Sequence, residues 1–313
     1  MEVLVNPGGP SAVRSDDPAA AGDTVRGDRD LWDEVFASQN LVTALKRVER
    51  NRGAAGVDGV ETHELRDWCR QHWVTTRAAL DAGTYRPSPV RQVMIPKPDG
   101  GQRKLGVPTV LDRLIQQAIA QVLSPVFDPG FVPVSYGFRP GKSAHDAVKV
   151  ARLVIEQGYR WVVEVDLDAF FDRVNHDILI SRVARQVKDK RLLKLIRAYL
   201  EAGIMVDGVR QRAGGGTPQG SPLSPLLSNI MLDDFDQEVW GRGHRFVRYA
   251  DDIRVFVKSK RAAERVLEQS TRLLEQRLKL KVNVAKSVIA PAATAVLLGY
   301  GFYFTSSGGR LRI

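Results

Sequence analysis

Cysteine is nearly absent from this chain of 313 residues, in which Cys69 is the single thiol. One thiol excludes an intrachain disulfide framework and a zinc site built from several thiolates, and it suits a reducing compartment. Histidine is scarce as well, and the sequence supplies neither His145 nor His176 with the partners of a nucleophilic triad. We therefore expect His145 and His176 to be structural.

Long apolar runs are missing too. No stretch approaches the ~18 residues that cross a bilayer, and the N-terminus lacks the basic and then apolar order of a signal peptide. These absences predict a cytoplasmic protein without a membrane partner. Residues 1–30 are rich in Gly, Pro, Ala and Asp without periodicity, which predicts a disordered leader or reflects where translation starts.

Positive charge, in contrast, is in excess. The formal net charge is +10 and the pI is about 9.8, while 43% of the residues are hydrophobic. The apolar fraction is enough for two or three compact subdomains. The excess of Lys and Arg indicates a polyanionic partner such as nucleic acid, and the alternative is a generally basic surface.

The first half of the chain predicts helices around a hairpin. Apolar residues at helical spacing indicate helices over residues 31–52 and 63–82. The segment RPSPVRQVMIPKPDGGQRKLGVPTV then predicts a β-hairpin that turns at Pro98-Asp99-Gly100-Gly101, followed by a helix over LDRLIQQAIAQVLSPVF.

The second half alternates strands and helices. The expected elements are strand RWVVEVD, helices within 176–202 and 223–239, a hairpin at 244–259, a helix over 260–279 and strand KVNVAKSVI. This order is typical of a ferredoxin-like α+β arrangement, in which helices cover one face of an antiparallel sheet. The other face would stay open to a duplex.

Two adjacent carboxylates occupy the predicted turn of the hairpin HRFVRYADDIRVFVKS. They are Asp251 and Asp252, and Asp166 ends the neighbouring strand RWVVEVD. Three carboxylates at one sheet edge can hold a pair of Mg²⁺ ions about 4 Å apart, as nucleotidyl transfer requires. An ordinary turn, in which Asp bonds nearby backbone N–H groups, is the alternative. Asp168 and Asp172 are weaker candidates, which we expect to cap a helix or face solvent.

Other residues around these carboxylates suit a nucleotide. Lys97 and Arg103 flank the tight turn of the first hairpin and could clamp a triphosphate, or they could be two solvated charges. Phe171 could lie under a sugar and block a 2′-hydroxyl, or it could serve the core with Phe170. Gln219 follows a glycine run that permits close approach to a ligand, and the alternative is a plain loop before a helix.

The chain resembles the bacterial group II intron-encoded reverse transcriptase/maturase family. Eight blocks in the same order, between about residues 31 and 304, carry the resemblance: NLVTALKRVERNRGAAGVDG, IPKPDGGQRKLGVPTVLDRLIQQAI, SYGFRPGKSAHDAV, DLDAFFDRVNHDIL, GTPQGSPLSPLLSN, RYADD, LKLKVNVAKS and LGYGFYF. It implies a right-hand polymerase with fingers and palm. Residues 31–160 would be an N-terminal extension and fingers, and 161–313 a palm that ends at the primer grip.

The resemblance also implies roles for individual residues. The implied catalytic residues are Asp166, Asp251 and Asp252, and Leu167 joins them as a metal ligand. The implied nucleotide-binding residues are Lys97, Arg103, Phe171, Gln219 and Lys286, and the implied primer grip is Leu298, Gly299 and Tyr300. Two Mg²⁺ ions, with Mn²⁺ as a substitute, would be the cofactors. The partners would be dNTPs, an RNA template, a DNA or RNA primer and, as an option, a group II intron RNA.

Members of this family usually continue into a helical thumb and a maturase region, whereas this chain stops at Ile313. We therefore expect weaker retention of a duplex and doubtful splicing activity. The alternatives are a truncated intron-derived RNA-binding protein, a reverse transcriptase recruited to a host role such as phage defence, and an RNA-directed RNA polymerase. Phe171 and Ala250 favour deoxynucleotides over the last of these.

Overall fold

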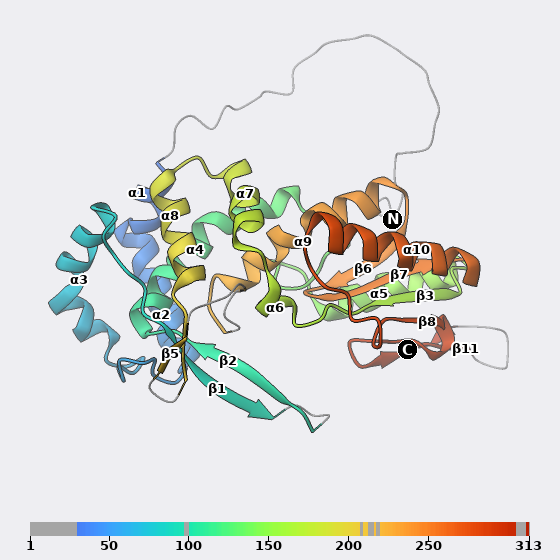
Figure 1. Ribbon diagram of the computed structural model, residues 1–313, viewed down its shortest axis with the longest axis horizontal. Helices are drawn as coiled ribbons and strands as arrows, with labels where there is room; N and C mark the ends of the chain where they lie inside the picture. Colours follow the sequence, from blue (N-terminus) through green and yellow to red (C-terminus); the bar gives the residue numbers. More distant parts are fainter. Residues whose placement is uncertain are drawn as a thin grey trace, which may run out of the picture.

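The computed structural model describes residues 30–96, 100–206, 209–211, 216, 220–304 and 311–312. Figure 1 shows a helical N-terminal part with a protruding β-hairpin beside a C-terminal sheet covered by helices. In the described residues no helix is long and apolar enough to cross a membrane.

The N-terminal helices pack around one apolar helix. The elements are α1 (Leu31–Phe36), α2 (Ser38–Asn51), α3 (Leu65–Asp81) and α4 (Val110–Phe127). On α4, Ile115, Ile119 and Leu123 recur every four residues and are fully buried against this group. The prediction of one helix over 31–52 was wrong, because Ala37 takes an extended conformation (ψ 139°) that separates α1 from α2.

The fingers sheet has the strand order β2-β1-β4-β5. Its strands are β1 (Val90–Pro96), β2 (Gln102–Val107), β4 (Ile204–Val206) and β5 (Val209–Gln211). The β1–β2 hairpin is antiparallel, as the sequence predicts. The sequence did not reveal that β1 also pairs in parallel with β4, from more than a hundred positions later. The C-terminal half of the chain therefore completes the fingers sheet.

The palm sheet has the order β6-β7-β3-β8, with all neighbours antiparallel. Its strands are β3 (Trp161–Val165), β6 (Arg245–Tyr249), β7 (Asp252–Val257) and β8 (Val288–Pro291). This is the ferredoxin-like order predicted from the sequence. One boundary differs: the last strand begins at Val288, because residues 281–287 instead form a bridge and a turn next to Asp166.

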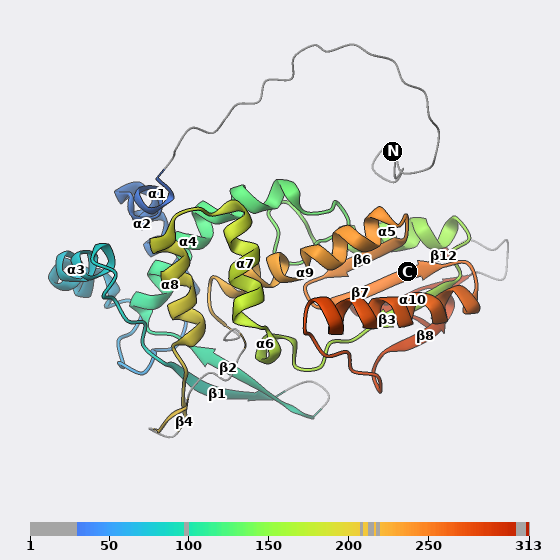
Figure 2. The ribbon, with the colours of Figure 1, turned by 45° about the horizontal axis from the view of Figure 1, so that its top comes forward.

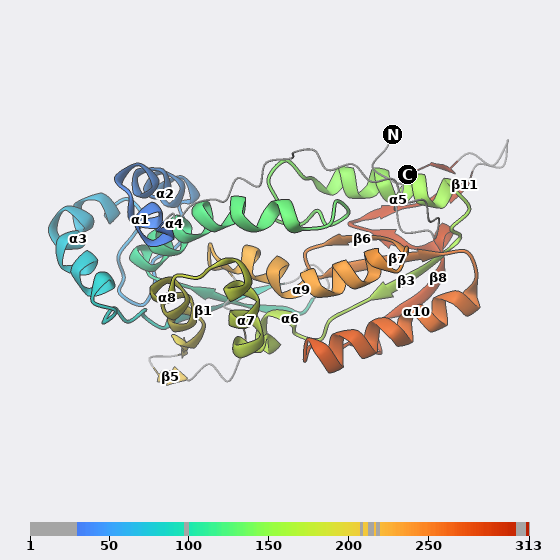
Figure 3. The ribbon, with the colours of Figure 1, turned by 90° about the horizontal axis from the view of Figure 1, so that it is seen from above.

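Helices cover one face of the palm sheet. Among them are α9 (Ser224–Gly241) and α10 (Lys260–Arg272), and a π-helical turn, Leu273–Arg277, extends α10, whereas α5 (Ala144–Glu156) packs beside the edge strand β6. Figures 2 and 3 show α9 and α10 side by side across the palm strands. The short helix α6 (Phe170–Arg173) leads into α7 (His176–Gln186) and α8 (Lys190–Glu201), which packs toward α1.

The opposite face of the palm sheet is only partly open. After β8 the chain forms the short strands β9 (Val296–Leu297), β10 (Tyr300–Gly301), β11 (Tyr303–Phe304) and β12 (Leu311–Arg312). Leu297 and Phe302 are buried, and Arg254 on β7 donates a hydrogen bond to the carbonyl of Val296. The chain therefore covers part of the face that we expected to stay open to a duplex.

Candidate active site

A buried hydrogen-bond network centred on Arg248 supports the turn between β6 and β7. Arg248, which is fully buried on β6, donates to both carboxylate oxygens of Asp236 and to Asn229 Oδ1 at 2.9 Å. Its guanidinium also donates to the carbonyl of Ala250 at 2.8 Å. Ala250 lies in the left-handed region (φ 57°), which turns the chain so that Asp251 is exposed and Asp252 begins β7. The network thus fixes the turn that carries both carboxylates.

Asp166 is fixed at the end of β3 by the segment that precedes β8. Its N–H donates to Ser287 Oγ at 3.1 Å, and its carbonyl accepts from the N–H of Asn283 at 2.8 Å. Val165 pairs with Ile253, so extending the register by one residue places Asp166 opposite Asp252. The structure therefore brings the three predicted aspartates to one edge of the palm sheet.

Asp252 has an unusual electrostatic environment. Burial raises the pKa of its carboxyl to about 6; nearby Arg254 opposes the rise, while the negative charges of Glu164, Asp251 and Asp166 add to it. Arg254 forms ion pairs with Asp252 and, at 2.7 Å, with Glu164 across the β3–β7 pair. The buried Arg254 thus balances part of the negative charge at this edge.

The donor chemistry at this edge suits a hard divalent cation. Carboxylate oxygens are the ligands that Mg²⁺ prefers, and clustered negative charge favours a cation. Leu167 forms a β-bridge with Val282, and its side chain is buried. Because a leucine side chain has no oxygen, only the main-chain carbonyl of Leu167 could coordinate a metal ion. Within the described ranges, no three acidic, His or Cys side chains already converge as a metal-binding group.

A cleft of about 390 Å³ lies between the N-terminal helices, the fingers sheet and the palm. Arg103 and Phe171, both predicted to bind a nucleotide, line it. The Phe171 side chain is buried and meets the ring of Phe170 edge to face at 5.1 Å. The two interpretations of Phe171 are therefore compatible, since its ring serves the core and also forms part of the cleft wall.

Two predicted nucleotide ligands, Lys97 and Gln219, lie outside the described residues. The neighbour of Gln219, Gly220, is described: it has a left-handed backbone (φ 103°), and a Cβ there would stand 2.8 Å from Leu105 on β2. The start of the segment after Gln219 is therefore packed against the strand that carries Arg103.

The remaining predicted residues are Lys286 and the three primer-grip residues Leu298, Gly299 and Tyr300. Lys286 is exposed in the turn just before Ser287, the residue that anchors Asp166. Leu298 and Gly299 form the tight turn between β9 and β10, both with positive φ. The Tyr300 hydroxyl lies 2.9 Å from His145 Nε2 on α5.

Of the weaker candidates, Asp168 forms an ion pair with Arg173 at 3.0 Å and does not cap α6, which Ala169 precedes without a side-chain cap. Asp172 is exposed, as one of the two alternatives for it predicted.

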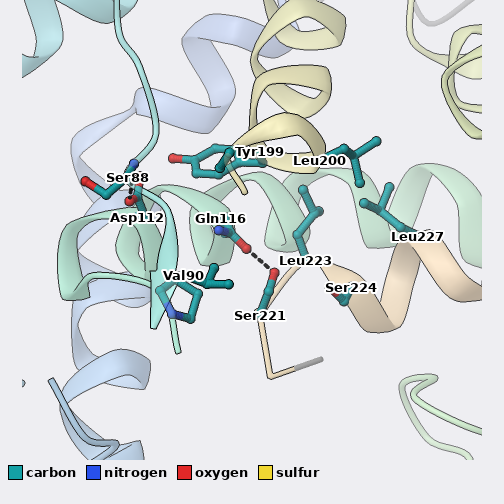
Figure 4. A pocket seen from close by; sticks show the side chains of 12 residues that line it. Ser88, Val90, Asp112, Gln116, Tyr199, Leu200, Ser221, Leu223, Ser224 and Leu227 are labelled. Carbon is teal, nitrogen blue, oxygen red and sulfur yellow. Dashed lines mark hydrogen bonds between the residues drawn. The ribbon is translucent and has the colours of Figure 1, made fainter. Parts of the chain in front are cut away.

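A second, smaller hollow is structural. Figure 4 shows Gln116 of α4 and Ser221 joined by a hydrogen bond, with Asp112 nearby beside Ser88. Asp112 is buried and accepts from the Tyr85 hydroxyl at 2.7 Å and from the N–H of Ser88 at 3.1 Å. The hollow has a volume of about 10 Å³, which is about the space of one water. These contacts fasten the base of the Gly220 segment to α4 and leave no room for a substrate.

The residues that support the turn are not evident from the sequence. In the sequence, Arg248 is not distinguished from the many other basic residues. No local pattern indicates that Asp236 and Asn229 are its hydrogen-bond partners. The available signal was the position of Arg248 between Val247 and Tyr249 in β6, because a charged side chain is seldom fully buried without a partner.

The chain matches a known protein family. A family model described as "Reverse transcriptase (RNA-dependent DNA polymerase)" matches residues 95–302. The chain belongs to the reverse transcriptase family. It is 35% identical over 289 residues to Protein YkfC of Escherichia coli, covering 80% of this chain and 76% of that protein.

It is also 41% identical over 162 residues to the group II intron-encoded protein LtrA of Lactococcus lactis, covering 51% of this chain and 27% of LtrA. The predicted relationship to group II intron-encoded proteins is therefore confirmed, and with it the assignment as an RNA-directed DNA polymerase. This chain matches only about a quarter of the length of LtrA.

Solved structures confirm the fingers and palm fold of this reverse transcriptase. A chain of a partial Cas6-RT-Cas1–Cas2 complex is similar with a TM-score of 0.50 and 27% identity, covering 80% of this chain and 43% of that one. Telomerase from Candida tropicalis with a fragment of telomeric RNA gives a TM-score of 0.53 at 15% identity, covering 80% and 48%. At that identity the telomerase likeness supports the fold alone.

Proposed function

We propose that this reverse transcriptase extends a primer 3′-hydroxyl with dNTPs on an RNA template, with the reaction centred on Asp166, Asp251 and Asp252. The observation that carries the proposal is the meeting of these carboxylates at one palm edge, across the β3–β7 register, in a chain whose nearby cleft is lined by Arg103 and Phe171. We also propose that fingers and palm divide near residue 160, with β4 and β5 rejoining the fingers, and that the protein works in the cytoplasm.

Each residue has a distinct task in this proposal. The carboxylates of Asp166, Asp251 and Asp252, with the carbonyl of Leu167, would hold two Mg²⁺ ions, or Mn²⁺ in their place. When bound, these ions would lower the pKa of the primer hydroxyl and support charge on the leaving pyrophosphate. Arg254 keeps Asp252 in place on β7, and Ser287 does the same for Asp166.

The nucleotide and primer contacts complete the site. Lys97, Arg103 and Lys286 would neutralise the triphosphate, because cations near phosphate oxygens form charge-assisted hydrogen bonds. Phe171 would exclude a 2′-hydroxyl by its bulk, and Gln219 would contact the nucleotide and the template. Leu298, Gly299 and Tyr300 would grip the primer. We include a group II intron RNA among the candidate templates, because the relative LtrA is group II intron-encoded.

Primer extension on an RNA template tests the proposal. Wild-type protein should incorporate dNTPs in Mg²⁺ far better than rNTPs, and EDTA should stop the reaction until Mg²⁺ or Mn²⁺ is restored. Asp251→Asn and Asp252→Asn should each lower incorporation by at least about 100-fold. Asp67→Asn, an exposed change on α3, is the matched control and should have no effect.

Three results would count against it. Synthesis from rNTPs alone would indicate an RNA polymerase. A folded protein that binds RNA but incorporates neither nucleotide would indicate a binding role. Undiminished synthesis by Asp252→Asn would remove that residue from the site.

A further inference from the structure

Phe138 is an aromatic residue in a costly position. Its backbone lies in the left-handed region (φ 60°), where bulky residues are rare, and 52% of its surface is exposed. The ring therefore gains little from burial while the backbone carries strain. Such strain persists where the surrounding structure imposes it, and it clusters at functional sites.

The surroundings of Phe138 do impose its position. On one side, Gly137 lies against the catalytic turn, and its carbonyl accepts from Asn229 Nδ2 at 2.9 Å. On the other side, the Arg139 guanidinium donates to Asp128 at 2.7 Å and to the carbonyls of Val132 and Ser135 at 2.7 and 3.0 Å. The backbone of Phe138 is thus fixed between two anchored neighbours, and its ring is half-exposed.

The ring lines the 390 Å³ cleft described above. Other walls come from Val48, Asn51 and Gly53 of the N-terminal extension and from Leu105 on β2. The volume lies in the range of about 300–1,000 Å³ that is usual for ligand sites. Apolar and aromatic walls, with Arg103 and Arg113 among the lining residues, suit a planar base attached to a phosphate backbone.

We propose that Phe138 is a stacking platform for a base of the template strand beside the catalytic turn. The inference rests on the proposed function and adds a residue to it. Phe171 and Phe138 come from separate elements but line the same cleft, so the cleft offers two aromatic surfaces. A newly forming base pair needs two bases held: the incoming nucleotide lies at Phe171 and Arg103, and the template base lies on Phe138.

A binding experiment without catalysis tests this role. The full chain is titrated in EDTA with a primer–template whose first unpaired template base is 2-aminopurine, and both the fluorescence change and the affinity are recorded. The variants are Phe138→Trp, which keeps an aromatic face, and Phe138→Asn, which tolerates a left-handed backbone better than Phe does. Val74→Asn, an 82% exposed apolar residue on α3, is the matched control.

Wild type, Phe138→Trp and Val74→Asn should quench the probe alike. Phe138→Asn should lose the quenching and bind roughly 5- to 100-fold more weakly, which is the range of base–aromatic stacking. Its melting temperature should equal or exceed that of wild type, because Asn relieves the backbone strain. A purely structural role would give the opposite order, with Phe138→Asn intact in binding.

Two further outcomes separate this inference from the proposed function. If wild type extends primers and Phe138→Asn quenches 2-aminopurine normally, the platform is refuted and the polymerase stands. If Phe138→Asn changes only the KM for dNTPs, the ring serves the incoming nucleotide and the template assignment is refuted. If wild type neither binds nor extends the primer–template, both proposals fall together.

Discussion

The backbone of Gly137 touches the backbone of Ala250: a Cβ on Gly137 would stand 2.1 Å from the Ala250 nitrogen. No relaxed structure has such a contact, so even a methyl group must displace the turn that carries Asp251 and Asp252. We expect Gly137→Ala to lower dNTP incorporation at least about tenfold, because small misplacements of reacting groups are costly. Primer extension beside a thermal melt measures this effect.

Gly130→Ala is the matched control for that change. Nothing lies within 4 Å of a Cβ at Gly130, so this variant should keep its activity and melting temperature. If Gly137→Ala is fully active, the contact does not position the carboxylates.

The buried Arg248–Asp236 pair predicts a large stability effect. Both side chains are fully buried, so Arg248→Met leaves a buried carboxylate without its partner. Breaking such a pair from one side costs about 3–5 kcal/mol. Urea unfolding should show this loss, whereas Arg152→Met, which breaks an exposed pair with Glu156, should cost less than about 1 kcal/mol. Adding Asp236→Leu to Arg248→Met should recover part of the loss, and a further loss would contradict this interpretation.

The neighbours Phe170 and Phe171 allow the sugar gate to be tested against packing. Both rings are buried and in contact with each other, but of the two residues it is Phe171 that lines the cleft. Each change to Ala should cost about 3–5 kcal/mol of stability. Phe171→Ala should also raise rNTP use relative to dNTP use, measured as the ratio of kcat/KM values, and Phe170→Ala should not. An equal rise in both variants would indicate a general loosening of the site.

Asp233 on α9 predicts a pH dependence of stability. Burial raises the pKa of its carboxyl to about 6, Gln237 opposes the rise through a hydrogen bond, and Asp236 and Asp234 add to it. Between the unfolded pKa of about 3.9 and the folded pKa of about 6, the native state holds more protons than the unfolded state. Stability attributable to this group is therefore fully present below pH 4 and is lost as the pH rises through 6.

Asp233→Asn removes the ionisable carboxyl and with it the loss of stability above pH 6. Gln237 can still donate to the amide oxygen, so the variant should be about 1–2 kcal/mol more stable than wild type at pH 7.5, after allowance for solvent screening. At pH 4.5 the two proteins should unfold at nearly the same urea concentration. An advantage that is equal at both pH values would show that the charge of Asp233 is not its source.

Periodic and locally encoded features were predictable from the sequence. The apolar repeat of α4, the two hairpins and the end of β3 at the catalytic edge follow from spacing and turn residues. The break at Ala37 was not predictable, because alanine favours helix. The contacts of Arg254 with Asp252 and Glu164 depend on strand register, and the pairing of β1 with β4 depends on residues far apart in sequence.

The interleaving of the two sheets has a consequence for biosynthesis. β1 can pair with β4 only after β4 has been synthesised, and β4 follows β3 in the chain. β3 in turn can pair with β8 only after residues 288–291 have been synthesised. Neither sheet can form completely while the ribosome is still translating the first two-thirds of this sequence. Non-local pairing of this kind folds slowly and exposes apolar edges for longer. The nascent chain is therefore expected to depend on chaperones until β8 has emerged from the ribosome.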